Sequence, residues 1–110
     1  VASNQTASFV AAEDLAFVTH ELLKKGVKSG IFHVVNEGYA SWANFAKEIV
    51  RLRKLKFKIK SVNRQGSYGD VPIPEFTALS TSKIRSYGIV LPHWKDALKR
   101  YLKFLEANGI

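Results

Sequence analysis

The sequence predicts an α/β fold with a small, partly parallel sheet and about four helices. Segments with helical spacing alternate along the chain with short extended segments, an order that is typical of α/β domains. The length of 110 residues suits a single core, so we expect residues 1–110 to form one domain. The composition is 46% hydrophobic and 24% charged without cysteine, which indicates a globular chain stabilised by packing and not by disulfides.

Four segments carry the signals of helices. The first, residues 12–25, has apolar residues at helical spacing, acidic residues in its first turn and lysines before a glycine at its end. The second begins after Ser41, whose hydroxyl suits a helix N-cap. A short third helix is expected through residues 84–87, and Pro92 opens the fourth.

The segments between these helices read as strands or loops. Residues 30–36 are an apolar run without alternation, which predicts a strand covered on both faces. Residues 56–61 alternate lysines with Phe57 and Ile59, which predicts an edge strand with a solvated lysine face. Residues 63–78 contain glycines and prolines but no period, so we expect a long loop there, of the kind that often has a binding role.

Positive charge is concentrated in one part of the chain. The net charge is +8, and most of the excess lies within residues 47–64. Such a cluster favours an anionic partner, so one alternative is a nucleic-acid binder that uses this basic stretch. The lysine row equally fits the solvated face of an edge strand, and on balance we expect no nucleic-acid partner.

No membrane partner is expected either. No helix combines a strongly basic face with an exposed aromatic one, and the apolar runs are far shorter than a membrane span. The first residues lack a secretory signal pattern, so the expected location is cytoplasmic.

A search for catalytic residues finds little. The histidines His20, His33 and His93 lack the spacing of metal ligands, and no metal site is predicted. The neighbouring acids Glu13 and Asp14 lie in a helix first turn, where the helix dipole explains them without a role in acid–base chemistry. No residue of this chain is therefore expected to be catalytic.

Several stretches, taken in order, resemble a known family. They resemble segments of the dTDP-4-dehydrorhamnose reductases, which belong to the extended short-chain dehydrogenase superfamily. The family segments are Asp-Gln-x-Gly-Ser-Pro-Thr…Asp-Leu-Ala, Gly-x-Tyr-His-x-x-Asn-x-Gly, Ser-Trp-x-x-Phe-Ala, Arg-Pro-x-x-Ser-x-Leu and Leu-Pro-x-Trp-x-x-x-Leu. The resemblance covers essentially the whole chain. The matching stretches here are Asn4 to Val10 with Glu13 to Ala16, Gly30 to Gly38, Ser41 to Ala46, Pro74 to Ile84, and Leu91 to Leu98.

The resemblance implies a function for this chain. It implies the carboxy-terminal, substrate-binding portion of an extended Rossmann-type, NAD(P)H-dependent reductase of 4-keto sugar nucleotides, in dTDP-rhamnose synthesis. The amino-terminal Rossmann half, which holds the NAD(P)H loop and a Tyr-x-x-x-Lys pair in the family, is absent here and is an expected partner. No tyrosine of this chain has a lysine four residues on. The chain alone is therefore expected to bind neither NADPH nor NADH and to be inactive.

Four residues are candidates for contact with the dTDP-sugar substrate implied by the resemblance. They are Gln5, Ser8, Phe76 and Thr77. Each also has a structural interpretation. Gln5 and Ser8 could hold a strand end, Phe76 could belong to the core, and Thr77 could prepare a helix cap.

The chain departs from the family pattern at several positions. Ala7, Phe9 and Val10 stand where the family has Gly, Pro and Thr, and Ile73 stands where it has Arg. The missing arginine removes a cation that could have faced a nucleotide phosphate. Two alternatives therefore stay open: a relative that acts on another nucleotide sugar, and a non-catalytic, regulatory binding module of the same fold.

Overall fold

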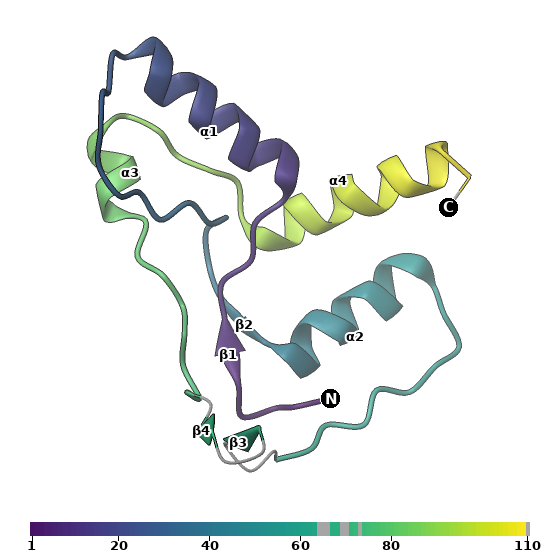
Figure 1. The fold of residues 1–110 in the computed structure, drawn as a ribbon. Helices are drawn as coiled ribbons and strands as arrows, with labels where there is room; N and C mark the ends of the chain where they lie inside the picture. The colour runs from purple at the N-terminus through teal and green to yellow at the C-terminus, as the bar shows by residue number, and fades with distance from the viewer. Residues whose placement is uncertain (64–66, 69–70, 73, 110) are drawn as a thin grey trace. The chain divides into compact units, whose positions relative to one another are not determined.

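The structure is a computed structural model that describes residues 1–63, 67–68, 71–72 and 74–109 (Figure 1). It divides into two compact units, each described here by itself. The first unit combines Val1–Ser8 with Tyr39–Ala78, and the second combines Phe9–Gly38 with Leu79–Ile110. The expectation of a single domain is not tested by this division and stays a prediction.

The fold is mixed α/β with four helices, as the sequence predicts. The predicted helices are all present and differ from their expected bounds by only one or a few residues. In chain order the elements are β1 (Thr6–Ala7), α1 (Ala12–Lys24), β2 (Ala40–Ser41), α2 (Trp42–Arg53), β3 (Ser67–Tyr68), β4 (Val71–Pro72), α3 (Ser82–Ser86) and α4 (Trp94–Ala107).

The partly parallel sheet is not confirmed. Strand β1 pairs with β2, and β3 pairs with β4, and both ladders are antiparallel and two residues long. Parallel pairing occurs within the described residues only as isolated bridges, which join Ala2 to Val62, Thr6 to Phe76 and Glu37 to His93.

The prediction of a strand at residues 30–36 is wrong. The segment forms no ladder, and Ile31 is 78% exposed, so it is not covered on both faces. Side chains hold it instead: Phe32 packs edge-on against Tyr87 with ring centroids 5.4 Å apart, and the Lys83 ammonium donates to the Ile31 carbonyl at 2.6 Å. In Figure 1 this segment runs past α3 within the second unit. The apolar run therefore reflects helix contacts and not strand neighbours.

The predictions for residues 56–61 and 63–78 also need correction. Residues 56–61 lie in no ladder. The Lys60 carbonyl accepts from the Val1 ammonium at 2.8 Å, and the Val62 N–H donates to the Val1 carbonyl at 2.8 Å. Their lysines are exposed, as expected. The segment 63–78 is not wholly irregular, because it contains β3 and β4. Its residues Arg64, Gly66, Gly69 and Ile73 lie outside the described residues.

Local capping explains where α2 and α4 begin. The Ser41 hydroxyl accepts from the Asn44 N–H at 3.1 Å, which confirms the predicted cap. Helix α4 begins at Trp94 and not at Pro92, because the His93 ring nitrogen Nδ1 accepts from the Lys95 N–H at 3.2 Å. His93 thus has a structural role that the sequence did not reveal.

The core of the second unit is small and apolar. Val18 of α1, Ile84 of α3, and Ile89 and Leu91 are buried together. Half-buried side chains pack around them: Leu22, Phe32, Val34 and Tyr87. Within the described residues, no helix has the length and apolar character needed to cross a bilayer.

A fully buried amide joins the parts of this unit. The Asn36 amide nitrogen donates to Asp14 at 2.6 Å and to the Pro92 carbonyl at 3.2 Å, and its oxygen accepts from the Ala11 N–H at 2.9 Å. Arg100 of α4 donates to the same Asp14 oxygen at 2.7 Å. The helix dipole alone is therefore an incomplete account of Asp14, which is a buried structural carboxylate.

The pKa of Asp14 is lower than its ordinary value. Burial alone would raise this pKa, but the hydrogen bonds from Arg100 and Asn36 and the charge of Arg100 outweigh burial. Because the pKa is lower in the folded than in the unfolded chain, Asp14 stabilises the fold above the unfolded-state pKa. This stabilisation is lost as the pH falls through the folded-state pKa.

We predict that Arg100→Gln lowers the free energy of unfolding at pH 7 by about 2 kcal/mol, because a charged hydrogen-bond donor to a buried carboxylate is lost. Lys99→Gln on the same helix is the control, because it removes an equal charge from an exposed side chain. Urea unfolding at a series of pH values from 7 down to 3 measures the free energy of unfolding of both variants and of the wild type. The difference between wild type and Arg100→Gln should shrink below about pH 4. A pH-independent difference would contradict this role for Asp14.

We also predict that Gly38→Ala destabilises more than Gly88→Ala. Both glycines have positive φ, +84° and +77°, so both variants carry the same backbone strain of about 1–2 kcal/mol. A Cβ at Gly38 would also lie 2.6 Å from Nε2 of His93, the cap of α4, whereas one at Gly88 meets nothing within 4 Å. Urea unfolding of the two variants measures the difference, and equal losses would show that the His93 ring moves away without cost.

Candidate functional site

The sequence-predicted site residues lie on or beside β1 in the first unit. Strand β1 pairs with β2 on one edge, with Thr6 opposite Ser41 and Ala7 opposite Ala40. On its other edge the Thr6 N–H donates to the Glu75 carbonyl at 2.7 Å, and the Thr77 N–H donates to the Thr6 carbonyl at 2.9 Å. The register therefore brings residues 5–8 and 75–77, about seventy positions apart in sequence, side by side.

The same register sorts the side chains onto two faces. Residues paired across strands share a face, and successive residues alternate. Thr6 is paired with Ser41 and Phe76, and continuing the register places Ser8 opposite Tyr39 on this face. The rings of Tyr39 and Phe76 meet edge to face with centroids 5.3 Å apart, in agreement with this assignment. We call the set Thr6, Ser8, Tyr39, Ser41 and Phe76 the aromatic face.

The aromatic face is open. Tyr39 is 61% exposed and Phe76 is 60% exposed, while Thr6 and Ser8 are half-buried. Exposed rings can lie against the apolar side of a sugar or a base, and hydroxyls can donate to or accept from ligand oxygens. The structural interpretation of Phe76 as a core residue is wrong, because its side chain is mostly exposed.

Gln5 lies on the opposite, buried face. It is 8% exposed, on the same face as the buried Ala40, and its carbonyl accepts from the Trp42 N–H at 3.1 Å. Its side-chain nitrogen Nε2 is buried and has no hydrogen-bond partner within the described part of the chain. A buried donor without a partner costs about 1–3 kcal/mol, so this amide calls for a partner from elsewhere.

Thr77 uses its hydroxyl within the fold. Its Oγ1 donates to the Thr6 carbonyl at 3.2 Å, so the hydroxyl reinforces the junction with β1 and does not prepare a helix cap. The structure thus brings Ser8 and Phe76 to one face, places Gln5 on the other, and gives Thr77 a structural contact. Whether any of the four contacts a substrate stays a prediction.

Sequence reasoning missed Tyr39. The residue lies just before β2 and forms half of the exposed ring pair with Phe76. The sequence held one signal, because Tyr39 lies two positions before the capping residue Ser41 and so shares its face in an extended segment. Its partner Phe76 could not be found in this way, since their contact depends on the register of residues 75–77.

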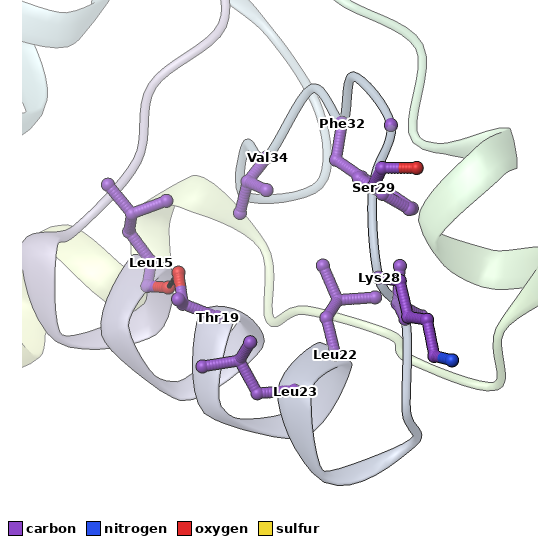
Figure 2. A pocket seen from close by; sticks show the side chains of 10 residues that line it. Leu15, Thr19, Leu22, Leu23, Lys28, Ser29, Phe32 and Val34 are labelled. Carbon is purple, nitrogen blue, oxygen red and sulfur yellow. Dashed lines mark hydrogen bonds between the residues drawn. The ribbon is translucent and has the colours of Figure 1, made fainter.

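Two open grooves lie in the second unit, away from the predicted site residues. One, of about 350 Å³, is lined by α1 and the following segment, and Figure 2 shows Leu15, Leu22, Phe32 and Val34 around it. The other, of about 450 Å³, lies beside Tyr101 and Phe104 of α4. Both are mainly apolar, whereas a nucleotide sugar needs several converging polar groups. We therefore place the candidate site on the first unit.

Metal ligands do not gather in the described residues. No group of three or more histidine, aspartate or glutamate side chains there is arranged to hold a metal ion.

Comparisons with known proteins identify relatives of the chain. It is 35% identical over 103 residues to the spore coat polysaccharide biosynthesis protein SpsK of Bacillus subtilis. It is 25% identical over 120 residues to a dTDP-4-dehydrorhamnose reductase of Sinorhizobium fredii. These matches cover 94% and 99% of this chain but only 36% and 40% of the two relatives. The chain thus spans well under half the length of these curated relatives.

Solved structures show the same fold. A dTDP-4-dehydrorhamnose reductase from Clostridium acetobutylicum matches with a TM-score of 0.87 at 25% identity, over 96% of this chain and 38% of that protein. The corresponding reductase from Bacillus anthracis, in complex with NADP, matches with a TM-score of 0.81 at 25% identity, over 93% of this chain and 36% of that protein. The family described as RmlD substrate binding domain matches residues 1–107, and the chain belongs to this family.

Proposed function

We propose that this chain is the substrate-binding part of an NAD(P)H-dependent reductase of 4-keto sugar nucleotides, similar to dTDP-4-dehydrorhamnose reductase. The aromatic face carries the proposal. It gathers two exposed rings and three serine or threonine hydroxyls on one open surface of a chain that belongs to a substrate-binding family. Relatives named as dTDP-4-dehydrorhamnose reductases support the choice of a dTDP-sugar as substrate.

Each residue of the proposed site has a distinct role. Tyr39 and Phe76 lie against the base or the sugar ring, and Ser8 forms a hydrogen bond with the ligand. Thr77 acts as a positioning residue, because its hydroxyl fixes the segment that carries Phe76 to β1. Gln5 lies on the opposite face, so its buried amide would donate to the cofactor-binding half of the enzyme and not to a ligand at the aromatic face.

The described residues do not fit NAD(P)H. A dinucleotide site needs a glycine-rich turn between a strand and the N-terminus of a helix, where backbone N–H groups hold the pyrophosphate. Here the only ladders among the described residues are antiparallel, and α1 and α2 begin after Ala11 and Ser41, without such a turn. We therefore assign the cofactor and the proton-donating residues to the Rossmann half, as a separate part of the same enzyme. The cytoplasmic location stays a prediction alongside this proposal.

Substrate binding at the aromatic face can be tested on this chain directly. We predict that Tyr39→Ala and Phe76→Ala each weaken dTDP binding about tenfold. Each variant removes one ring, whose stacking on the ligand contributes about 1.4 kcal/mol to the binding free energy. Nuclear magnetic resonance titration with dTDP measures the dissociation constants. Phe57→Ala is the control, because Phe57 is a similarly exposed ring in the same unit but outside the aromatic face. Equal losses for all three variants, or binding no tighter than that of inorganic phosphate, would contradict the proposal.

The assignment of the cofactor can be tested separately. We predict that this chain alone gives no heat of binding with NADPH in calorimetric titration and does not oxidise it in the presence of a dTDP-4-keto sugar. The physical reason is the missing phosphate-binding turn. A complete reductase of the same family serves as the positive control. A dissociation constant in the low micromolar range for this chain would show that it holds a cofactor site of its own.

A further inference from the structure

The chain segment after α2 has a regular pattern that the proposed function does not use. Residues 54–60 read Lys-Leu-Lys-Phe-Lys-Ile-Lys, a strict alternation of lysine and apolar side chains. All four lysines are exposed, and among the apolar residues Phe57 is 69% and Leu55 is 42% exposed. We call these residues the lysine strand. Lys54 closes α2 in a left-handed conformation and the Lys60 carbonyl accepts from the Val1 ammonium at 2.8 Å, while the residues between them lie in no ladder.

Two kinds of group in the lysine strand are available to a partner: the lysine side chains and the backbone. Its lysines form no ion pair within the described part of the chain, in contrast to Arg51, whose guanidinium holds Glu48 on α2. The backbone is also open, because the described residues give Lys56, Phe57 and Lys58 no backbone hydrogen bond. A segment whose backbone groups are unpaired can serve as a template for the addition of another strand.

The positive charge of the lysine side chains determines which kind of strand can pair with the lysine strand. Lysines directly opposite lysines repel across a ladder, so the segment resists pairing with its counterpart on a second copy. The chain contains no alternating acidic segment that could take its place, since its nine acids are scattered. A strand with acidic residues at alternate positions would oppose each lysine with a carboxylate, and its apolar residues would meet Leu55, Phe57 and Ile59 on the other face.

We propose that the lysine strand is a docking edge for an extended acidic peptide segment, which adds to it as a β-strand with alternating acidic and apolar side chains. Single-stranded nucleic acid fits less well. In an extended segment Phe57 lies on the face opposite to the lysines, so bases could not stack on it while the phosphates contact the lysines.

The test uses two blocked peptides of the same composition. One is Glu-Val-Glu-Val-Glu-Val-Glu, and the other has its four glutamates in one block followed by the valines. We expect the alternating peptide to bind at least on the order of tenfold more tightly, because only it opposes every lysine with a carboxylate. We also expect it to slow hydrogen exchange at the backbone amides of residues 55–61 selectively. Equal binding of the two peptides would show attraction by net charge alone and would overturn the proposal.

Matched variants locate the site. Replacing Lys56, Lys58 and Lys60 together by Gln should weaken binding of the alternating peptide by on the order of tenfold. Replacing the exposed Lys24, Lys99 and Lys103 together by Gln removes the same charge elsewhere and should leave binding nearly unchanged. Thermal melts check that both variants stay folded. Equal losses for the two variants would overturn the proposal.

Other anionic partners are measured beside the peptide. Vesicles with one-third anionic lipid and a short oligothymidylate are titrated against the wild type and the Lys56, Lys58 and Lys60 variant. If the vesicles or the oligothymidylate bind more tightly than the peptide, and the Lys56, Lys58 and Lys60 variant loses that binding, the lysine strand is a site for a lipid surface or for nucleic acid. That result would overturn the proposal.

Discussion

The buried amide of Asn36 is the interaction on which the second unit depends. An amide with no access to solvent must find its partners inside the protein. Here they come from two segments distant in sequence: the start of α1, through Ala11 and Asp14, and the approach to α4, through Pro92. Moving any one of them would leave a buried polar group unpaired. Arg100 completes the arrangement by compensating the charge of Asp14. Hydrogen bonds thus fix the relative placement of helices whose shared apolar core is small.

The first unit is organised by a different constraint, the position of β1 between two neighbours. A strand with β2 on one side and residues 75–77 on the other has both backbone edges occupied, although each pairing is very short. Helix α2 then begins directly after β2, and the Ala43 N–H donates to the Ala2 carbonyl at 2.9 Å. Gln5, Ala40 and Ala43 are buried, and the opposite face is left open. The exposed ring pair of Tyr39 and Phe76 follows from this one-sided covering.

Helices could be predicted from the sequence because their signals are local. Ser41 as a cap and the glycine after Tyr87 act within a few residues of the helix ends they determine. Strands could not be predicted equally well, because a ladder needs a partner. Residues 30–36 have a strand-like composition but no neighbouring strand among the described residues, and residues 67–68 and 71–72 look irregular but pair as an antiparallel ladder. The same limit applied to the site: Ser8 and Phe76 share a face only through pairings between segments distant in sequence, and the partners of Asn36 lie up to 56 positions away.

The two units differ in how completely they satisfy their own polar groups. In the second unit the buried Asn36 amide donates to the buried Asp14 carboxylate, and the half-buried Arg100 guanidinium donates to the same carboxylate. In the first unit three features have no such contact in the described residues: the Gln5 amide nitrogen, the open side of the ring pair, and the backbone and lysines of residues 56–58. A buried donor without a partner costs stability, so the Gln5 amide is more readily explained by binding than by folding, whereas the exposed rings and lysines carry no such cost. Gln5 lies on the face opposite to the rings, so one ligand could not contact both. The proposals above therefore require separate partners at the aromatic face, at Gln5 and at the lysine strand.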